Sequence, residues 1–110
     1  MNKEIKKLWL EALRSGEYKQ GQWRLHNPKK GTFCCLGVLC DVVDKNDIYK
    51  PERTLRKDDI ECFDYLSETL SIPIQKIAGL DKQIEKDLYK MNDRQRKSFT
   101  EIADYIERAL

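Results

Sequence analysis

Residues 32–43 read TFCCLGVLCDVV, an apolar run interrupted only by Thr32, Gly37 and Asp41. The run begins directly after turn-forming residues, so its first four residues predict a short strand. Its second part has the i, i+3, i+4, i+7 spacing of a helix face, at Leu36, Leu39, Cys40 and Val43. We therefore expect a strand that turns into a buried helix near Gly37.

Residues 22–26, on the N-terminal side of this run, predict the partner strand. They alternate in polarity, with Trp23 and Leu25 on one face. Residues 27–31 read NPKKG, which is typical of a turn because Pro fixes φ and Gly accepts a positive φ. The sequence therefore predicts a β-hairpin made of residues 22–26 and 32–35.

Amphipathic helices are predicted at both ends of the chain. The first begins after an Asn2 N-cap, ends at Gly16, and has one apolar face formed by Ile5, Leu8, Trp9, Ala12 and Leu13. The last begins with a capping box between Ser98 and Glu101. Its apolar stripe consists of Phe99, Ile102, Ala103, Ile106 and Leu110.

The remaining residues give weaker patterns. We expect the polar residues 44–59 to be the most mobile segment, and residues 62–70 to form a helix or a short strand. Pro73 suits the start of a short helix that ends at Gly79, and residues 82–90 predict another helix with Ile84 and Leu88 facing inward. The sequence thus predicts one α+β domain over residues 1–110, mostly helical, with one β-hairpin between the first and second helices.

Composition restricts the classes of function. The chain has 21 Lys and Arg against 19 Asp and Glu, a net charge of +2, which argues against a strongly basic nucleic-acid binder. It shows neither a secretory leader nor a stretch long enough for a membrane helix, so we expect a cytoplasmic protein without a membrane partner. Its four cysteines are then expected to be reduced.

The cysteines leave two chemical alternatives open besides packing. Cys34, Cys35, Cys40 and Cys62, with His26, offer donors for zinc, but adjacent residues of an extended segment point to opposite faces. A nucleophilic pair of Cys34 and His26 across the hairpin is allowed by the turn, yet a catalytic thiol needs a polar, accessible environment. The apolar neighbours favour core packing, and we expect no metal and no cofactor.

Residues 98–106 are similar to strings that open helix-turn-helix units, but the sequence ends at Leu110, before a recognition helix. Glycine-rich phosphate loops are also absent from the sequence. What remains is a set of polar residues at the ends of predicted helices. These are Arg14, Tyr18, Gln20, Asn92 and Asp93. They act either as caps and turns or as a ligand site, in which an Arg, a Tyr and amide groups suit a nucleotide.

Four motifs carry a resemblance: LRSGEYKQG (13–21), FCCLGVLCD (33–41), MND (91–93) and SFTEIA (98–103). Together they resemble a family of small uncharacterised proteins encoded by phages and prophages. The resemblance covers both ends of the chain and leaves residues 44–70 unaccounted for. It implies a role against host antiviral defence, either by blocking a defence protein or by sequestering a nucleotide-derived immune signal. The family's polar motif positions fall on the same five residues.

The leading hypothesis is therefore a binding protein, not an enzyme, that captures a nucleotide-like immune signal. Arg14 would contact a phosphate, Tyr18 would stack on a base or ribose, and Asn92 and Asp93 would hydrogen-bond polar edges, with Gln20 as a further ligand-binding residue. We expect a homo-oligomer, because two Trp and five Tyr exceed what a small core must bury. The alternatives are a protein–protein inhibitor of a host defence enzyme and a small hydrolase that uses His26 and Cys34.

Overall fold

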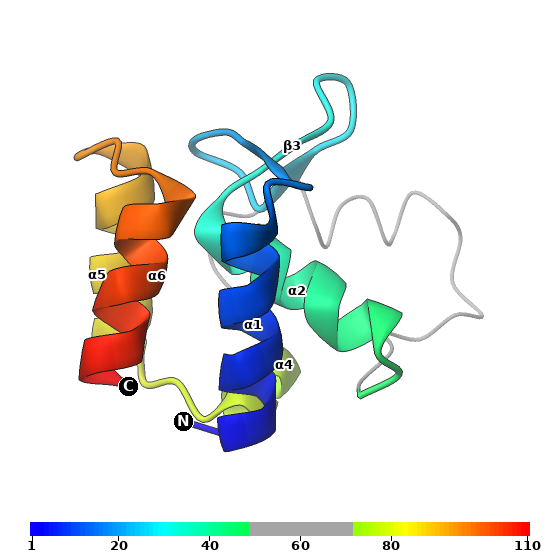
Figure 1. Ribbon diagram of the computed structural model, residues 1–110, viewed down its shortest axis with the longest axis vertical. Coiled ribbons are helices and arrows are strands. Elements are labelled where there is room, and N and C mark those ends of the chain that lie inside the picture. The colour runs from blue at the N-terminus through cyan, green and yellow to red at the C-terminus, as the bar shows by residue number, and fades with distance from the viewer. Residues whose placement is uncertain (49–71) are drawn as a thin grey trace.

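The computed structural model describes residues 1–48 and 72–110. This part of the chain forms five helices and a three-stranded sheet. In chain order they are α1 (Lys3–Ser15), β1 (Lys19–Gln20), β2 (His26–Asn27), β3 (Thr32–Phe33), α2 (Cys35–Lys45), α4 (Ile72–Ala78), α5 (Lys82–Asp93) and α6 (Phe99–Ala109). The helices form the body of the molecule, and the sheet lies at the end opposite both termini (Figure 1). The predicted α+β class is confirmed.

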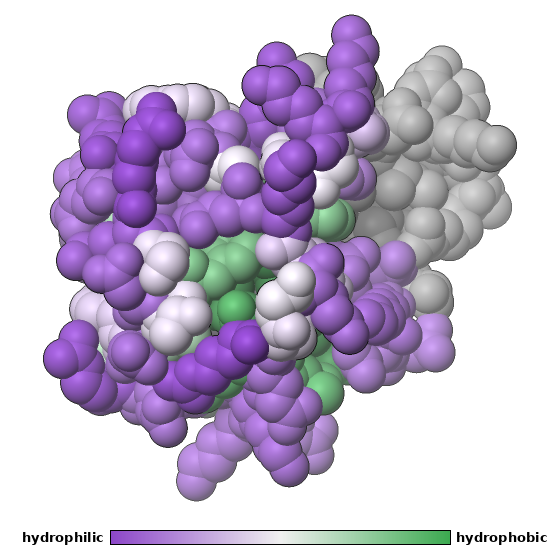
Figure 2. Space-filling view, turned by 45° about the horizontal axis from the view of Figure 1, so that its top comes forward, coloured by the Kyte–Doolittle hydropathy of each residue, from purple (hydrophilic) through white to green (hydrophobic). Residues whose placement is uncertain are grey.

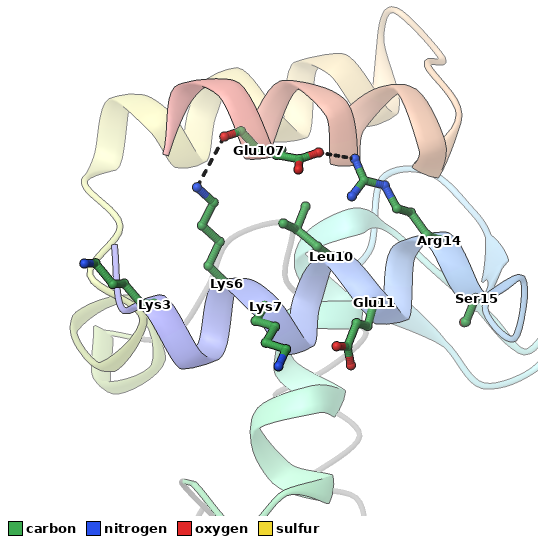
Figure 3. A pocket seen from close by; sticks show the side chains of 8 residues that line it. All are labelled: Lys3, Lys6, Lys7, Leu10, Glu11, Arg14, Ser15 and Glu107. Atoms are coloured by element: carbon green, nitrogen blue, oxygen red, sulfur yellow. Dashed lines mark hydrogen bonds and ion pairs between the residues drawn. The ribbon is translucent and has the colours of Figure 1, made fainter.

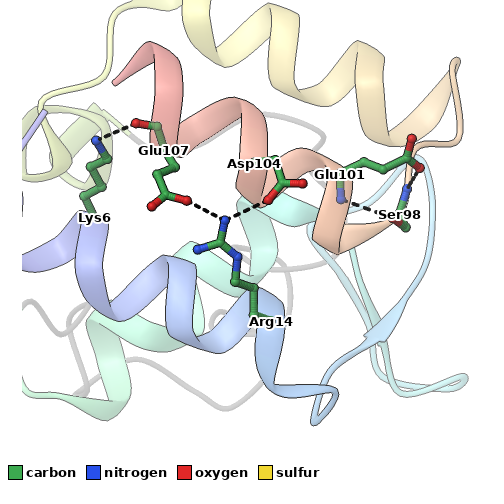
Figure 4. Close-up of polar contacts among 6 residues, drawn as sticks. All are labelled: Lys6, Arg14, Ser98, Glu101, Asp104 and Glu107. Carbon is green, nitrogen blue, oxygen red and sulfur yellow. Dashed lines mark hydrogen bonds and ion pairs between the residues drawn. The ribbon is translucent and has the colours of Figure 1, made fainter.

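Helices α1 and α6 begin and end as their capping residues predict. The Asn2 side chain accepts a hydrogen bond from the backbone N–H of Ile5 at 3.0 Å, and Gly16 ends α1 with a φ of 78°. At the start of α6, Ser98 and Glu101 form the expected reciprocal capping box (Figure 4). Both helices were therefore predictable from short-range signals alone.

Helix α2 is the centre of the core. Eight of its eleven residues are buried, and its first carbonyl, at Cys35, accepts a hydrogen bond from the buried indole of Trp9 at 2.9 Å. Gly37 lies inside this helix because a Cβ there would be 1.7 Å from the carbonyl oxygen of Leu25. The sequence predicted a helix that starts near Gly37, but α2 starts two residues earlier, at Cys35. Gly37 allows close packing against Leu25 and does not mark the helix start.

Strand β3 lies between the other two strands, antiparallel to β2 and parallel to β1. The predicted hairpin is confirmed, but the expected strand over residues 22–26 is wrong. Trp23 has a φ of 73°, which breaks the extended backbone and places its side chain in solvent, whereas Leu25 is fully buried. The two side chains therefore do not share a face.

The two short-range predictions in the C-terminal half are also confirmed. Pro73 is the second residue of α4, and Gly79 follows its end with a φ of 73°. Helix α5 extends three residues beyond the predicted end, and Leu88 on it is fully buried. The expectations for residues 49–59 and 62–70 lie outside the described residues.

The helices pack around one core. Helix α1 contacts α2 and α6, and α5 contacts the same two helices; Figure 1 shows α1 and α6 side by side and antiparallel. Cys34, Cys35 and Cys40 are buried within this core, as expected, and Cys62 lies outside the described residues. No helix in residues 1–48 and 72–110 is long and apolar enough to cross a bilayer.

Candidate functional site

Asn92 lies in the last turn of α5 and is fully buried. Its side-chain oxygen accepts hydrogen bonds from Gln20 Nε2 at 2.9 Å and from the backbone N–H of Cys35 at 3.2 Å. Its side-chain nitrogen donates to the Gly21 carbonyl and to the Asp93 carboxylate, both at 2.8 Å. The hydrogen-bonding capacity of the amide is thus filled by protein groups. Asn92, on α5, is thus hydrogen-bonded both to the C-terminal end of β1 and to the start of α2.

Gln20 and Asp93 belong to the same buried network. Gln20 Nε2 also donates to the Lys97 carbonyl at 2.7 Å, so both of its hydrogens are used. Asp93 is only 2% exposed and lies near the two buried thiols. Burial, with a contribution from the Asp93 charge, raises the pKa of Cys34 to about 12, so this thiol stays protonated at neutral pH.

Tyr18 is directed to a different place. Its hydroxyl donates a hydrogen bond to the carboxylate of Asp41 on α2, and its ring meets the edge of Phe33 at 5.1 Å between centroids. The Lys45 ammonium lies 5.9 Å from the ring centroid. Burial and the Asp41 contact raise the pKa of the Tyr18 hydroxyl. The ring is therefore held between α2 and the sheet.

Arg14 lies on the face where α1 meets α6. Its Nη2 donates to Glu107 Oε1 at 2.7 Å and to Asp104 Oδ1 at 2.8 Å (Figure 4). The hydrogen bonds to Glu107 and Asp104 raise the pKa of the guanidinium. Because the three groups are largely exposed, these ion pairs orient the arginine more than they stabilise the fold.

The five residues grouped from the sequence are therefore brought to three places. Gln20, which is partly buried, forms one hydrogen-bonded network with the buried Asn92 and Asp93, Tyr18 contacts α2, and Arg14 contacts α6. The first three form hydrogen bonds between separate elements of the fold, whereas the alternative of caps and turns concerned contacts with sequence neighbours. Their position at element ends, which grouped them in the sequence, does not bring them around one ligand.

A groove of about 570 Å³ follows α1 beside α6. It is lined by Lys3, Lys6, Lys7, Leu10, Glu11, Arg14, Ser15 and Glu107. Figure 2 shows a hollow over apolar side chains at the centre of one face, surrounded by hydrophilic ones. In Figure 3, Lys6 and Arg14 reach from α1 toward Glu107, and Leu10 lies between them. Arg14 is the one residue of the sequence-based set that lines this groove.

The groove lysines were missed because a charged helix face is normally only solvated. Lys3, Lys6 and Lys7 occupy the first two turns of α1, where Lys3 and Lys7 are exposed and Lys6 is half-buried. Lys6 Nζ donates to the Glu107 carbonyl at 3.3 Å. Within the part of the chain that the structure describes, Lys3 and Lys7 form no ion pair. The signal in the sequence was their i, i+3, i+4 spacing, which places them together.

The hairpin residues considered for catalysis or zinc binding pack against other side chains of the fold. His26 stacks on the Phe33 ring at 4.2 Å between centroids, with an interplanar angle of 10°. Burial holds the pKa of Cys35 well above its ordinary value. Across residues 1–48 and 72–110, no three His, Cys, Asp or Glu side chains are grouped as a metal site would require.

A family model described as "Domain of unknown function (DUF8296)" matches residues 1–110. The chain belongs to this DUF8296 family. No curated protein and no solved structure matches it. The Asn92 network and the α1–α6 groove are thus features of a DUF8296 domain.

Proposed function

We propose that this protein is a binding protein that captures a small, anionic, nucleotide-derived molecule in the α1–α6 groove and holds it unchanged. The observation that carries the proposal is the groove itself, whose lining has four cationic side chains against two carboxylates, with the apolar Leu10 between them. Its volume of about 570 Å³ lies within the range of roughly 300–1,000 Å³ found for small-molecule sites.

The phosphate groups of such a ligand would bind at the N-terminal half of α1. Lys3, Lys6 and Lys7 line the groove there, and the positive end of the helix dipole adds to their field. Three ammonium groups within two turns repel one another, and Lys3 and Lys7 have no carboxylate partner among the described residues. An anion would relieve this repulsion, so the arrangement favours a phosphate-bearing ligand.

The rest of the ligand would lie over Leu10 toward Arg14. Leu10 offers an apolar surface for a base or a ribose. The Nη2 atom of Arg14 is occupied by Asp104 and Glu107. Its Nε and Nη1 atoms make no hydrogen bond within the described residues, and can donate to a second phosphate or to a ribose hydroxyl. Arg14 thus keeps the ligand-binding role expected from the sequence, with different neighbours.

The biological role that we propose rests on the resemblance to phage and prophage proteins. Capture of a nucleotide-derived immune signal in the host cytoplasm would prevent that signal from activating a host defence protein. A homo-oligomer would raise the number of groove sites per particle. Calorimetry tests the proposal directly, with cyclic dinucleotides and ADP-ribose as ligands and chromatography to recover the ligand afterwards.

The design compares two triple variants of equal charge change. Lys3→Gln/Lys6→Gln/Lys7→Gln is expected to weaken binding at least tenfold, since each lost charge-assisted bond contributes about 1.5–3 kcal/mol. The control, Lys76→Gln/Lys82→Gln/Lys86→Gln, neutralises exposed lysines on α4 and α5 and is expected to bind as the wild type does. Binding absent at millimolar ligand, or an equal loss in both variants, contradicts the proposal. Conversion of the ligand would identify a hydrolase instead.

A protein–protein inhibitor is the second candidate, and the apolar side chain of Leu10, which lines the groove between Lys6 and Arg14, favours it. A helix of a host defence enzyme would place apolar side chains over Leu10 and acidic ones against the lysines. Pull-down from host lysate separates the two functions. A stoichiometric protein partner that is lost with Leu10→Glu, together with no nucleotide binding, favours the inhibitor.

A further inference from the structure

Two segments of the chain carry cations and no carboxylates. Residues 18–33 contain Lys19, Arg24, Lys29 and Lys30, and residues 94–98 contain Arg94, Arg96 and Lys97. The other 89 residues hold the remaining 14 Lys and Arg together with all 19 Asp and Glu. The net charge of +2 therefore conceals a strong segregation of charge along the chain.

The fold brings these two segments together. Gln20 Nε2 donates to the Lys97 carbonyl at 2.7 Å, and Asn92 Nδ2 donates to the Gly21 carbonyl at 2.8 Å. Figure 1 shows the strand loops and the α5–α6 loop at the same end of the molecule, opposite the termini. We call this surface, residues 18–33 and 94–98, the basic end.

An aromatic side chain projects from the basic end. Trp23 is 46% exposed, and its φ of 73° is unusual for a bulky residue. The loop that holds it is anchored, because the next residue but one, Leu25, is fully buried and its carbonyl accepts a hydrogen bond from the Cys34 N–H at 3.1 Å. A strained backbone that keeps an indole in solvent is typical of a binding position.

The hairpin turn presents two further cations in a fixed conformation. Asn27 Oδ1 accepts hydrogen bonds from the backbone N–H groups of Lys29 and Lys30, at 3.1 and 3.3 Å, and Gly31 has a φ of 65°. Both lysine side chains are exposed. Four carboxylates lie nearby: Asp93 is buried, Glu101 caps α6, Asp41 accepts the hydrogen bond of the Tyr18 hydroxyl, and Glu17 borders the patch.

We propose that the basic end binds single-stranded nucleic acid. The cations would follow the phosphate backbone, and the Trp23 indole would stack on an unpaired base. A single strand fits better than a duplex, because paired bases offer no free face to a projecting indole. This surface is separate from the α1–α6 groove, so its function does not depend on the small-molecule proposal.

Fluorescence anisotropy with a labelled oligothymidylate tests the proposal at low and at moderate salt. Trp23→Ala is expected to weaken binding about 5- to 150-fold, the range found for loss of one stacked base. Lys29→Gln/Lys30→Gln/Arg96→Gln should flatten the dependence of log Kd on log salt by about 2, since each lost phosphate contact removes roughly 0.7. Near-ultraviolet circular dichroism of the buried Trp9 verifies that each variant is folded.

The control is again Lys76→Gln/Lys82→Gln/Lys86→Gln, which neutralises three lysines outside the basic end and is expected to leave the oligonucleotide affinity unchanged. Three outcomes would overturn the proposal: an equal loss in this control, equal affinity for duplex and single strand, or wild-type affinity in Trp23→Ala. Tighter binding to phosphatidylserine-containing vesicles than to the oligonucleotide would instead assign the surface to anionic membranes.

Discussion

Replacing Asn92 with alanine tests whether the residue supports the fold or contacts a ligand. The side chain makes four hydrogen bonds, to Gln20, Cys35, Gly21 and Asp93. At about 0.5–1.5 kcal/mol for each bond, the sum is roughly 2–6 kcal/mol. Water can reach the partially exposed Gln20 and Gly21, whereas the N–H of Cys35 stays buried without a partner. We therefore expect Asn92→Ala to lower the free energy of unfolding by about 3 kcal/mol.

Urea unfolding followed by tryptophan fluorescence measures this change. Trp9 is a suitable reporter because its indole donates to the carbonyl of Cys35, the residue whose N–H binds Asn92. A loss of about 3 kcal/mol with a slope of about 1.5 kcal/mol/M lowers the midpoint by about 2 M. Gln95→Ala, an exposed amide in the next loop, is the control and should change stability by less than about 0.5 kcal/mol.

The account of this network is refuted if Asn92→Ala unfolds at the same urea concentration as Gln95→Ala. Unchanged stability combined with lost nucleotide binding would restore Asn92 as a ligand contact. Lost stability with retained binding by the folded fraction would support the separation of network and groove.

Three further predictions concern packing and titration. Gly37→Ala should lower the free energy of unfolding by about 3 kcal/mol or more, because its Cβ would lie 1.7 Å from the Leu25 carbonyl oxygen. At Gly31 a Cβ would meet nothing within 4 Å, and only the positive φ opposes a side chain. Thermal unfolding of Gly31→Ala should therefore show a smaller loss of about 1 kcal/mol. The Cys34 thiol should resist iodoacetamide in the folded protein, and peptide mapping that finds rapid labelling of native Cys34 would contradict its burial. The free energy of unfolding should also fall as the pH rises from 9.0 toward about 12, because the thiol loses its proton at lower pH in the unfolded chain than in the folded protein. Hydrogen bonds from Ser98 lower the pKa of Glu101. The difference in Tm between wild type and Glu101→Ala should therefore shrink as the pH falls through that lowered pKa. A difference in Tm that does not change with pH would contradict a stabilising role of the Glu101 carboxylate in the capping box.

Much of the fold could be predicted from local signals. The caps at Asn2 and Ser98 and the turn at residues 27–31 depend on neighbours in the sequence, and all three are confirmed. The strand expected over residues 22–26 is wrong because Trp23 has a positive φ and because the buried Leu25 lies against Gly37 of α2. Alternation of residue types contains no information about such a contact.

The candidate site was predicted less well, for a related reason. Asn92 and Asp93 resembled surface caps because polarity predicts exposure, yet a closed set of hydrogen bonds lets Asn92 be buried. The lysines of α1 resembled an ordinary solvated face, since only the tertiary structure places α6 beside them to form a groove. Arg14 was grouped in the sequence with residues that lie elsewhere in the fold, because its carboxylate partners are about ninety residues away.

The most direct test of the central claim is an NMR titration of isotope-labelled protein with ADP-ribose and with a cyclic dinucleotide. We predict that the largest amide shift changes fall on residues 3–15 and 104–107, around Lys6, Leu10 and Glu107, and that residues 92 and 93 change little. Changes centred on Gln20, Asn92 and Asp93, or no change at millimolar ligand, would contradict the assignment of the groove as the binding site.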